Sequence, residues 1–433
     1  MPAVSAAFAV AVFAVAYLLI ATERINRVVV ALGGAALMLA LRLVSSQDAF
    51  HSQRLGIDWD VIFLLVGMMV IVGVLKQTGL FDYLAIWSAK RARARPARIL
   101  AALVVITAVA SALLDNVTTV LLVAPVTVLV CGRLGVPPVP FLVAEALASN
   151  IGGTATLIGD PPNIIIASQA GLSYTDFLVH LAPLVVVLMV VFLLLLRRLF
   201  ARSLAYHPER AVQLLKLDER QAITDPALLL RALGVLGVVT VAFALHGVLH
   251  YQPSVVALLG AGLLVLLARR DPGQFLREVE WPTLAFFMGL FVMVGALVKT
   301  GVVATLANAA AATTGGSLLV ASGLLLWLSG ALSAIVDNIP YVATMAPVTA
   351  ELVQTMPDHH DPRVLWWSLA LGADLGGNAT AIGASANVVV LGLADRAGHP
   401  IRFLEFARYG TLVAVITMAI SMLYLWLRYF LPG

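Results

Sequence analysis

The chain has 433 residues, with 27 Lys or Arg and 23 Asp or Glu, and therefore a formal net charge of +4. Hydrophobic residues make up 61% and charged residues 12%, the latter about half the share in soluble domains. This composition excludes a soluble globular domain, a disordered chain and a nucleic-acid-binding protein. Continuous apolar runs such as residues 185–196 lack the alternation of a membrane β-barrel, so they predict an all-α polytopic membrane protein.

Twelve apolar segments follow one another along the chain, and one long polar stretch, residues 201–226, separates the sixth from the seventh. We expect this stretch to be a cytoplasmic linker between two halves, residues 1–200 and 227–433. The segments lie near 4–22, 25–44, 60–76, 98–131, 139–170, 176–199, 227–247, 253–269, 282–299, 317–354, 364–394 and 404–429.

The two halves repeat each other. A shift of 222 residues lays SALLDNVTTVLLVAPVT (111–127) over SAIVDNIPYVATMAPVT (333–349), and a shift of 224 lays GGTATLIGDPPN (152–163) over GGNATAIGASAN (376–387). Over residues 58–79, 111–130 and 150–163, 24 of 56 aligned residues are identical. The matches include Asp-Asn and Gly-Gly, which chance similarity of apolar helices would not reproduce, so they indicate an internal duplication.

Four segments are too long for one span of about 20 residues. Residues 98–131 and 317–354 carry Asp-Asn near the middle, and arms of about 16 residues would be too short for a core of about 30 Å. We expect each to be a re-entrant hairpin. Residues 139–170 and 364–394 are expected to be broken helices whose Gly-Gly pairs supply the irregular backbone. Five crossings and one hairpin per half make an odd count, which inverts the second repeat.

Lys and Arg divide unevenly between the two predicted sides, with 22 on one and five on the other. The positive-inside rule places the 22 in the cytoplasm of a plasma-membrane protein, with both termini extracytoplasmic. The basic amphipathic stretch 81–95 is expected at the cytoplasmic interface. Charge alone does not separate ten spans plus two hairpins from twelve spans.

Inverted repeats with broken helices are typical of secondary transporters. Carboxylates inside a membrane are costly, which makes them functional candidates, and oxygen-rich groups suit H⁺ or Na⁺. Pro161 and Pro162 predict the restart of a helix whose positive end faces the site. We expect no Lys or Arg within the core. The candidate substrate- and ion-binding residues are Asp115, Asn116, Thr118, Asn150, Gly152, Gly153, Thr154, Thr156, Asp160, Asn163, Asp337, Asn338, Asp374, Gly376, Gly377, Asn378, Thr380, Ser385 and Asn387.

Three other features of the sequence lie outside the candidate site. Glu145 has no acidic counterpart in the second repeat, where Ser368 lies in the matching region, so it is either a proton carrier or a capped structural acid. Cys131 is a lone cysteine, which excludes a disulfide or a multi-thiolate metal site and favours a packing role. The DHHD tract at 358–361 is expected to be an exposed loop and not a metal site.

The stretches DNVTTVLLVAPVT, SNIGGTATLIGDPPNIII, SAIVDNIPYVATMAPVT and LGGNATAIGASANVV resemble the ion transporter superfamily across essentially the whole chain. Within it they are similar to the branch of arsenite permeases (ArsB), NhaD Na⁺/H⁺ antiporters and melanosomal P proteins. The resemblance implies an elevator-type permease with a citrate transporter-like domain and no enzyme activity. It also implies a homodimer, no cofactor beyond a coupling H⁺ or Na⁺, and a soluble ATPase as a possible partner.

The leading functional hypothesis is ion-coupled export of arsenite or a related oxyanion, with Asp115 and Asp337 carrying the coupling ion. Arsenite near neutral pH is mostly uncharged As(OH)₃, which a core of hydroxyls and amides could bind. The tip and loop sequences look closest to the P protein, so Na⁺/H⁺ antiport and P-protein-like anion transport are alternatives, as is a passive anion channel. An intramembrane aspartyl protease is a remote alternative because two Asp occupy symmetric segments.

Overall fold

The computed structural model describes residues 2–22, 24–52, 55–200, 204, 209, 218–246, 250–269, 272–356 and 360–431. Within these residues the chain is helical and contains no strand, which confirms the all-α prediction. Eight of the described helices are long and apolar enough to cross a membrane, or nine if the bent pair α18–α19 counts as one span. Apolar side chains on the outer surface, such as Leu404 at 79% exposure, suit contact with lipid.

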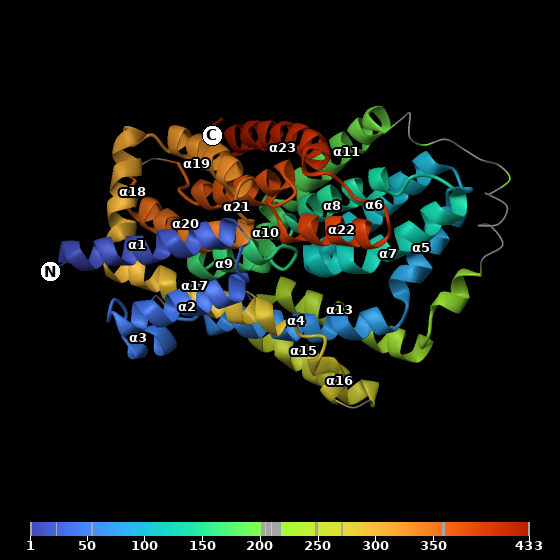
Figure 1. The fold of residues 1–433 in the computed structure, drawn as a ribbon, viewed down its shortest axis with the longest axis horizontal. Helices are drawn as coiled ribbons and strands as arrows, with labels where there is room; N and C mark the ends of the chain where they lie inside the picture. The colour runs from blue at the N-terminus through green and yellow to red at the C-terminus, as the bar shows by residue number, and fades with distance from the viewer. Residues whose placement is uncertain are drawn as a thin grey trace.

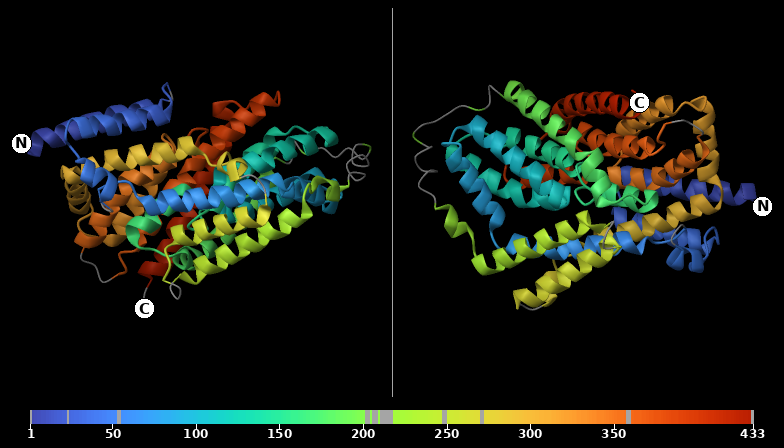
Figure 2. Two further views of the ribbon diagram at one scale, coloured as in Figure 1. Left: turned by 90° about the horizontal axis from the view of Figure 1, so that it is seen from below. Right: turned by 180° about the vertical axis from the view of Figure 1, so that it is seen from behind.

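The helices form two units, the first of which lies along the lower part of Figure 1. In this first unit α2 packs on α17, and α15 and α13 pack along α4, as Figure 2 shows from below. The unit combines helices from both halves of the chain. Its members are α1 (Pro2–Ala21), α2 (Arg27–Ala40), α3 (Ser46–His51), α4 (Trp59–Gln77), α13 (Pro226–Ala244), α15 (Pro253–Ala268), α16 (Pro272–Leu276) and α17 (Trp281–Lys299).

The second unit contains the hairpins and the broken helices, and α5 (Leu80–Arg91) and α18 (Val302–Thr313) connect it to the first unit. In it α6 packs on α8, and α19 packs on α21. Its members are α6 (Pro96–Leu113), α7 (Asn116–Leu134), α8 (Val139–Gly153), α9 (Pro161–Ala170), α10 (Tyr174–His180), α11 (Ala182–Leu199), α19 (Leu318–Ser333), α20 (Asn338–Thr355), α21 (Val364–Gly376), the 3₁₀ turn η2 (Gly377–Ala379), α22 (Ser385–Arg396), α23 (Phe403–Leu425) and the π-helical turn η3 (Trp426–Phe430).

The hydrogen bonds of the second unit repeat between the two halves. In each half a serine and a threonine tie the broken helix to the first arm of the hairpin. Ser111 Oγ donates to the Ser149 carbonyl (2.7 Å), and its counterpart Ser333 Oγ donates to the Ala373 carbonyl (2.7 Å). Thr156 Oγ1 donates to the Ala112 carbonyl (2.5 Å), and its counterpart Thr380 Oγ1 donates to the Ala334 carbonyl (2.5 Å). Helices α6 to α8 extend to the right of the centre in Figure 1 and α19 to α21 to the left, consistent with inverted repeats.

The hairpin arms are longer than the sequence suggested. Three of them have 18 or 19 residues, and the fourth, α19, has 16. Both α6 and α7 are long and apolar enough to cross a membrane. The expectation of arms too short to span is therefore wrong for the first hairpin, and the re-entrant placement stays a prediction.

The Gly-Gly pairs do not supply the irregular backbone, which corrects a second expectation. Gly152 and Gly153 are helical, as is Gly376, and the non-helical links run over residues 154–160 and 380–384. A Cβ on Gly152 would lie 2.2 Å from the Ala108 carbonyl oxygen, and one on Gly376 would lie 2.3 Å from the Gly330 Cα. The pairs therefore permit each broken helix to approach the first hairpin arm closely. Pro161 begins α9, as predicted.

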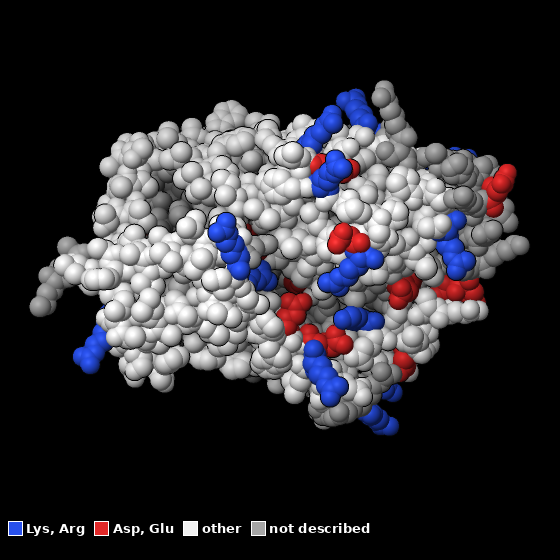
Figure 3. All heavy atoms as spheres, viewed as in Figure 1, with Lys and Arg blue, Asp and Glu red and all other residues white. Residues whose placement is uncertain are grey.

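The sequence also predicted an uneven distribution of charge and two polar tracts, the linker 201–226 and DHHD at 358–361. On the face drawn in Figure 3, charged side chains gather over the middle and the right, and few lie on the left, over α1 and α2. Most of the predicted linker 201–226 and the first two residues of the DHHD tract lie outside the described residues. The described part of the linker includes η1 (Glu219–Ala222), which packs on α5.

Candidate functional site

Buried polar side chains converge where the two hairpin tips meet the two broken helices. We call them the polar centre: Asn116, Asn150, Asp160, Asn338, Asp374, Asn378 and Asn387, each at most 2% exposed. They come from α7, α8, the link before α9, α20, α21, η2 and α22. All of these elements belong to the second unit.

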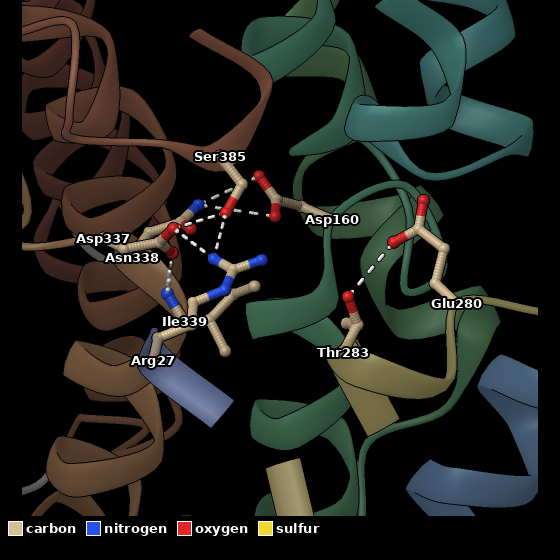
Figure 4. Close-up of polar contacts among 8 residues, drawn as sticks. All are labelled: Arg27, Asp160, Glu280, Thr283, Asp337, Asn338, Ile339 and Ser385. Atoms are coloured by element: carbon tan, nitrogen blue, oxygen red, sulfur yellow. Dashed lines mark hydrogen bonds and ion pairs between the residues drawn. The ribbon is translucent and has the colours of Figure 1, made fainter. Parts of the chain in front are cut away.

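Asp160 joins the two hairpin tips. Asn116 Nδ2 donates a hydrogen bond to Asp160 Oδ2 at 2.9 Å. Asn338 Nδ2 lies 3.3 and 3.2 Å from Asp160 Oδ1 and Oδ2. One carboxylate from the first broken helix thus accepts from the equivalent asparagines of both repeats (Figure 4 shows the Asn338 side).

Asn150 joins the first hairpin tip to the second broken helix. It accepts from Asn116 Nδ2 at 3.0 Å, and its own Nδ2 donates to Asn378 Oδ1 at 2.9 Å and to Asn387 Oδ1 at 3.1 Å. A buried amide whose donors and acceptor are all used holds its neighbours in one arrangement. Asn150 therefore fixes the position of the second repeat relative to the first.

The two repeats place their acids at positions that are not equivalent. Under the shift of 224, Asn150 corresponds to Asp374, and Asp160 corresponds to Ala384. Both oxygens of Asp374 are buried, and no donor among the described residues meets hydrogen-bond geometry with them. The neighbouring donors, on Thr154 and Asn163, bond to backbone carbonyls instead. A buried carboxylate without a donor is costly as a bare anion, so Asp374 requires a proton or a cation.

Further oxygens near Asp374 could share a cation with it. Thr154 and Asn163 lie beside Asp374. The Oδ1 atom of Asn163 is also buried without a donor in the described part of the chain. Carboxylate and amide oxygens fit Na⁺, which is a hard cation, and the carboxylate alone fits a proton. The described residues contain no cluster of three or more His, Cys, Asp or Glu that could hold a transition metal.

Other predicted site residues shape the two links. Asn163 Nδ2 donates to the Thr156 carbonyl at 3.1 Å, and Asn387 Nδ2 donates to the Gly377 and Thr380 carbonyls, both at 2.9 Å. These bonds close the non-helical links 154–160 and 380–384 from inside. The predicted threonines of the links donate their hydroxyls to backbone carbonyls, and the glycines contribute close packing.

The hairpin-tip acids act as helix caps. Asp115 Oδ1 accepts from the Thr118 backbone N–H at 2.7 Å, and Asp337 Oδ1 accepts from the Ile339 N–H at 3.1 Å. Such caps satisfy N–H groups that lack partners at a helix start. Thr118 therefore enters the site through its backbone N–H.

Arg27 also reaches this region, so the expectation that no Lys or Arg lies in the core is wrong. Its Nη1 lies 2.9 Å from Ser385 Oγ and 3.3 Å from Asp337 Oδ2, and Ser385 Oγ also donates to Asp337 (Figure 4). Sequence reasoning assigned Arg27 to a cytoplasmic loop. The available signal was its position, because Arg27 lies inside the predicted apolar segment 25–44 and at the start of α2.

Glu145 and Cys131 lie outside the polar centre. Glu145 is fully buried, Thr127 Oγ1 donates to its Oε1 at 2.5 Å, and its Oε2 has no donor among the described residues. That contact favours the structural role for one oxygen and leaves a site for a proton on the other. Cys131 is buried on α7.

A cavity of about 1330 Å³ separates the two units beside the first broken helix. Asp58, Asp60 and Glu351 line it together with His51 and His246. Ser168 of α9 donates to Asp58 across the cavity, and Ser254 Oγ donates to Asp60 Oδ1 at 2.6 Å. Its acidic lining would concentrate cations beside α9.

The chain is similar to proteins named as transporters. The sequence pattern of the citrate transporter family matches residues 17–372. A protein of Mycobacterium tuberculosis named as an uncharacterized transporter is 57% identical over 422 residues, which is 98% of each chain. The human P protein is 33% identical over 509 residues, covering 98% of this chain and 60% of the P protein.

Two solved transporters share the fold. The YdaH transporter of Alcanivorax borkumensis superposes with a TM-score of 0.64 at 15% identity, covering 92% of this chain and 96% of that one. MtrF of Neisseria gonorrhoeae, described as an antimetabolite efflux pump, has a TM-score of 0.63 at 10% identity, with 99% and 96% covered.

The fold and these relatives define a multi-pass secondary transporter and exclude the aspartyl protease alternative. The chain belongs to the citrate transporter family. Its likeness to the P protein agrees with the ion transporter superfamily that the motifs resemble.

Proposed function

We infer that this chain couples transport to H⁺ or Na⁺ and that Asp374 carries the coupling ion. The observation that carries this proposal is the buried Asp374 carboxylate, which has no donor among the described residues. The hairpin-tip acids Asp115 and Asp337 already accept backbone hydrogen bonds as caps. We therefore assign the coupling ion to Asp374 in place of the two tips.

Asp160 links ion binding to the hairpin tips. Its charge interacts with that of Asp374, and the two buried acids repel each other when both are ionised. A proton or Na⁺ on Asp374 removes this repulsion and favours an ionised Asp160, which is the form that accepts from Asn116 and Asn338. The coupling ion would thereby tighten both tips around the substrate.

Export of arsenite or a related oxyanion across the plasma membrane is the substrate proposal. The polar centre and the hairpin tips hold one arginine, Arg27, which is paired with Asp337, against the four acids Asp115, Asp160, Asp337 and Asp374. This charge balance disfavours a free anion and tolerates neutral As(OH)₃. The unpartnered Nδ2 of Asn378 offers a donor to a hydroxyl oxygen. A homodimer and a soluble ATPase partner remain proposals from the superfamily resemblance.

Na⁺/H⁺ antiport is the second candidate, and the excess of carboxylates in and beside the polar centre favours it. P-protein-like anion transport would instead require Arg27 to be released from Asp337. Measuring Na⁺-dependent proton flux without any arsenical separates antiport from arsenite export.

The test is arsenite uptake into everted membrane vesicles driven by an imposed pH gradient, with and without Na⁺. Asp374→Asn should lower gradient-driven uptake by about 100-fold, within the usual range of coupling between sites. Asp395→Asn, at an exposed position on α22, is the matched control and should leave uptake unchanged. Gradient-driven flux of normal size in Asp374→Asn would refute the assignment of Asp374. Uptake equal to empty-vector vesicles in the wild type would remove arsenite as the substrate.

A further inference from the structure

A side chain of the first unit reaches the second hairpin tip. Arg27 begins α2, which packs on α17 in the first unit. Its Nη1 contacts Asp337, 310 positions away at the tip before α20, and Ser385, which begins α22. Arg27 therefore fastens a hairpin tip and a broken helix of the second unit to a helix of the first (Figure 4).

The guanidinium is held from both units yet remains accessible. Its Cζ lies 5.3 Å from the ring centroid of Phe286 on α17, a distance that suits a cation–π contact. The side chain of Arg27 is 39% exposed and that of Asp337 is 16% exposed. A pair that water reaches can exchange one cation for another, whereas a sealed pair cannot do so without exposing a buried charge.

The contact of Arg27 with Asp337 and Ser385 involves the second repeat's hairpin tip, and the first repeat has different residues at the matching positions. Helix α15 packs on α4 as α2 packs on α17, and it begins at Pro253 after Gln252. Pro161 occupies the position at the start of α9 that Ser385 occupies at the start of α22, and proline has no hydroxyl to donate. The fastening is therefore specific to the second hairpin tip.

We propose that Arg27 is a tethered counter-cation that competes with a second Na⁺, separate from the coupling ion at Asp374, for the Asp337 carboxylate. This inference rests on the proposed cation coupling. Asp337 Oδ2 accepts from both Arg27 and Ser385, while Oδ1 accepts from the Ile339 N–H. Two cations on one carboxylate repel each other, so Na⁺ at Oδ2 displaces the guanidinium. Displacement frees the second hairpin tip from α2, which lets the two units separate.

The first measurement is hydrogen exchange of the purified full chain at the backbone amides of residues 336–341. Arg27→Gln should speed exchange there by about tenfold, and Arg27→Lys by less, since lysine retains the charge with a simpler donor. Arg24→Gln removes an exposed arginine three residues away and is the matched control. Exchange of the tip at the wild-type rate in folded Arg27→Gln would overturn the fastening.

The second measurement titrates Na⁺ against the same exchange. In the wild type, Na⁺ should displace the guanidinium and speed exchange of the tip by up to about tenfold, towards the Arg27→Gln rate. In Arg27→Gln, which has no guanidinium to displace, Na⁺ should not speed exchange. Wild-type exchange that Na⁺ leaves unchanged or slows, or an equal acceleration by Na⁺ in both proteins, would overturn the competition. Absence of gradient-driven flux in the wild type would refute the proposed function. The exchange rate of the tip in Arg27→Gln would then still decide whether Arg27 fastens the tip.

Discussion

At the scale of single residues, the polar centre depends on matching each donor to an acceptor. Asp160 is the acceptor for the equivalent asparagines of both repeats, and Asn150 offers an acceptor and two donors to three other asparagines. Asp374 occupies the position equivalent to Asn150 but receives no donor among the described residues. The second repeat thus has an acid, Asp374, where the first has the amide Asn150, and this acid is the unpaired carboxylate of the polar centre.

Asp160→Asn should weaken the centre. An amide at this position keeps one acceptor oxygen and loses the other, so its NH₂ would be set against the NH₂ of Asn338 and a buried donor would be left unpaired. We expect a loss of about 1–3 kcal/mol in the free energy of unfolding and a fall in transport. Thermal unfolding of the purified chain measures the first quantity. Stability equal to the wild type would contradict the role of Asp160 as joint acceptor, and Asp395→Asn again serves as the control.

At the scale of elements, close approach of paired helices positions the acids. Gly152 and Gly376 lie against the backbones of α6 and α19, and neighbouring serines bond across the same two contacts. The broken helices are therefore held by the first hairpin arms and not by their own sequence. This explains why the glycines are helical although they lie next to the breaks.

Gly152→Ala should destabilise the chain, because its Cβ would lie 2.2 Å from the Ala108 carbonyl oxygen and 2.5 Å from the Ala108 Cα. Overpacking of this kind costs about 1–3 kcal/mol. Gly132→Ala in α7 meets nothing within 4 Å and should be neutral or stabilising by about 0.5–1 kcal/mol. Thermal unfolding of both variants checks this contrast. Equal stabilities would show that α6 and α8 are not closely packed at this point.

At the scale of the whole molecule, two units share helices from both halves of the chain. The polar centre lies in one unit, while Arg27 comes from the other and the acidic cavity lies between them. Movement of one unit past the other would change the contacts of Arg27 and of Asp58 with Ser168. Under the proposed competition, Na⁺ at Asp337 and movement of the units would both change the contacts of Arg27.

The uneven charge distribution predicts that both chain ends face the outside of the cell. Epitope tags at each end should be cleaved by protease in spheroplasts and protected in everted vesicles, because the basic loops are retained in the cytoplasm. A tag in the linker 201–226, which is predicted to be cytoplasmic, supplies the opposite control. Protection of either terminal tag in spheroplasts would contradict the predicted topology.

Much of the architecture follows from local sequence. Apolar length and the position of Asp-Asn, Pro-Pro and the polar links determined the helices, the duplication and the broken helices. They also singled out every member of the polar centre. These features are readable because hydrophobicity and capping act over a few residues. The pairing of Asn150 with two side chains more than 220 positions away is not readable in this way.

The sequence by itself determined a membrane transporter of two related halves, because lipid requires apolar helices and duplication leaves matching motifs. Only the tertiary structure decided that Asp374 is the unpaired acid and that Arg27 lies at a hairpin tip. It also showed that Gly152 and Gly376 are needed for close helix packing. Each of these depends on which distant backbone or side chain fills a neighbouring space. Long-range packing, and not local preference, sets that outcome.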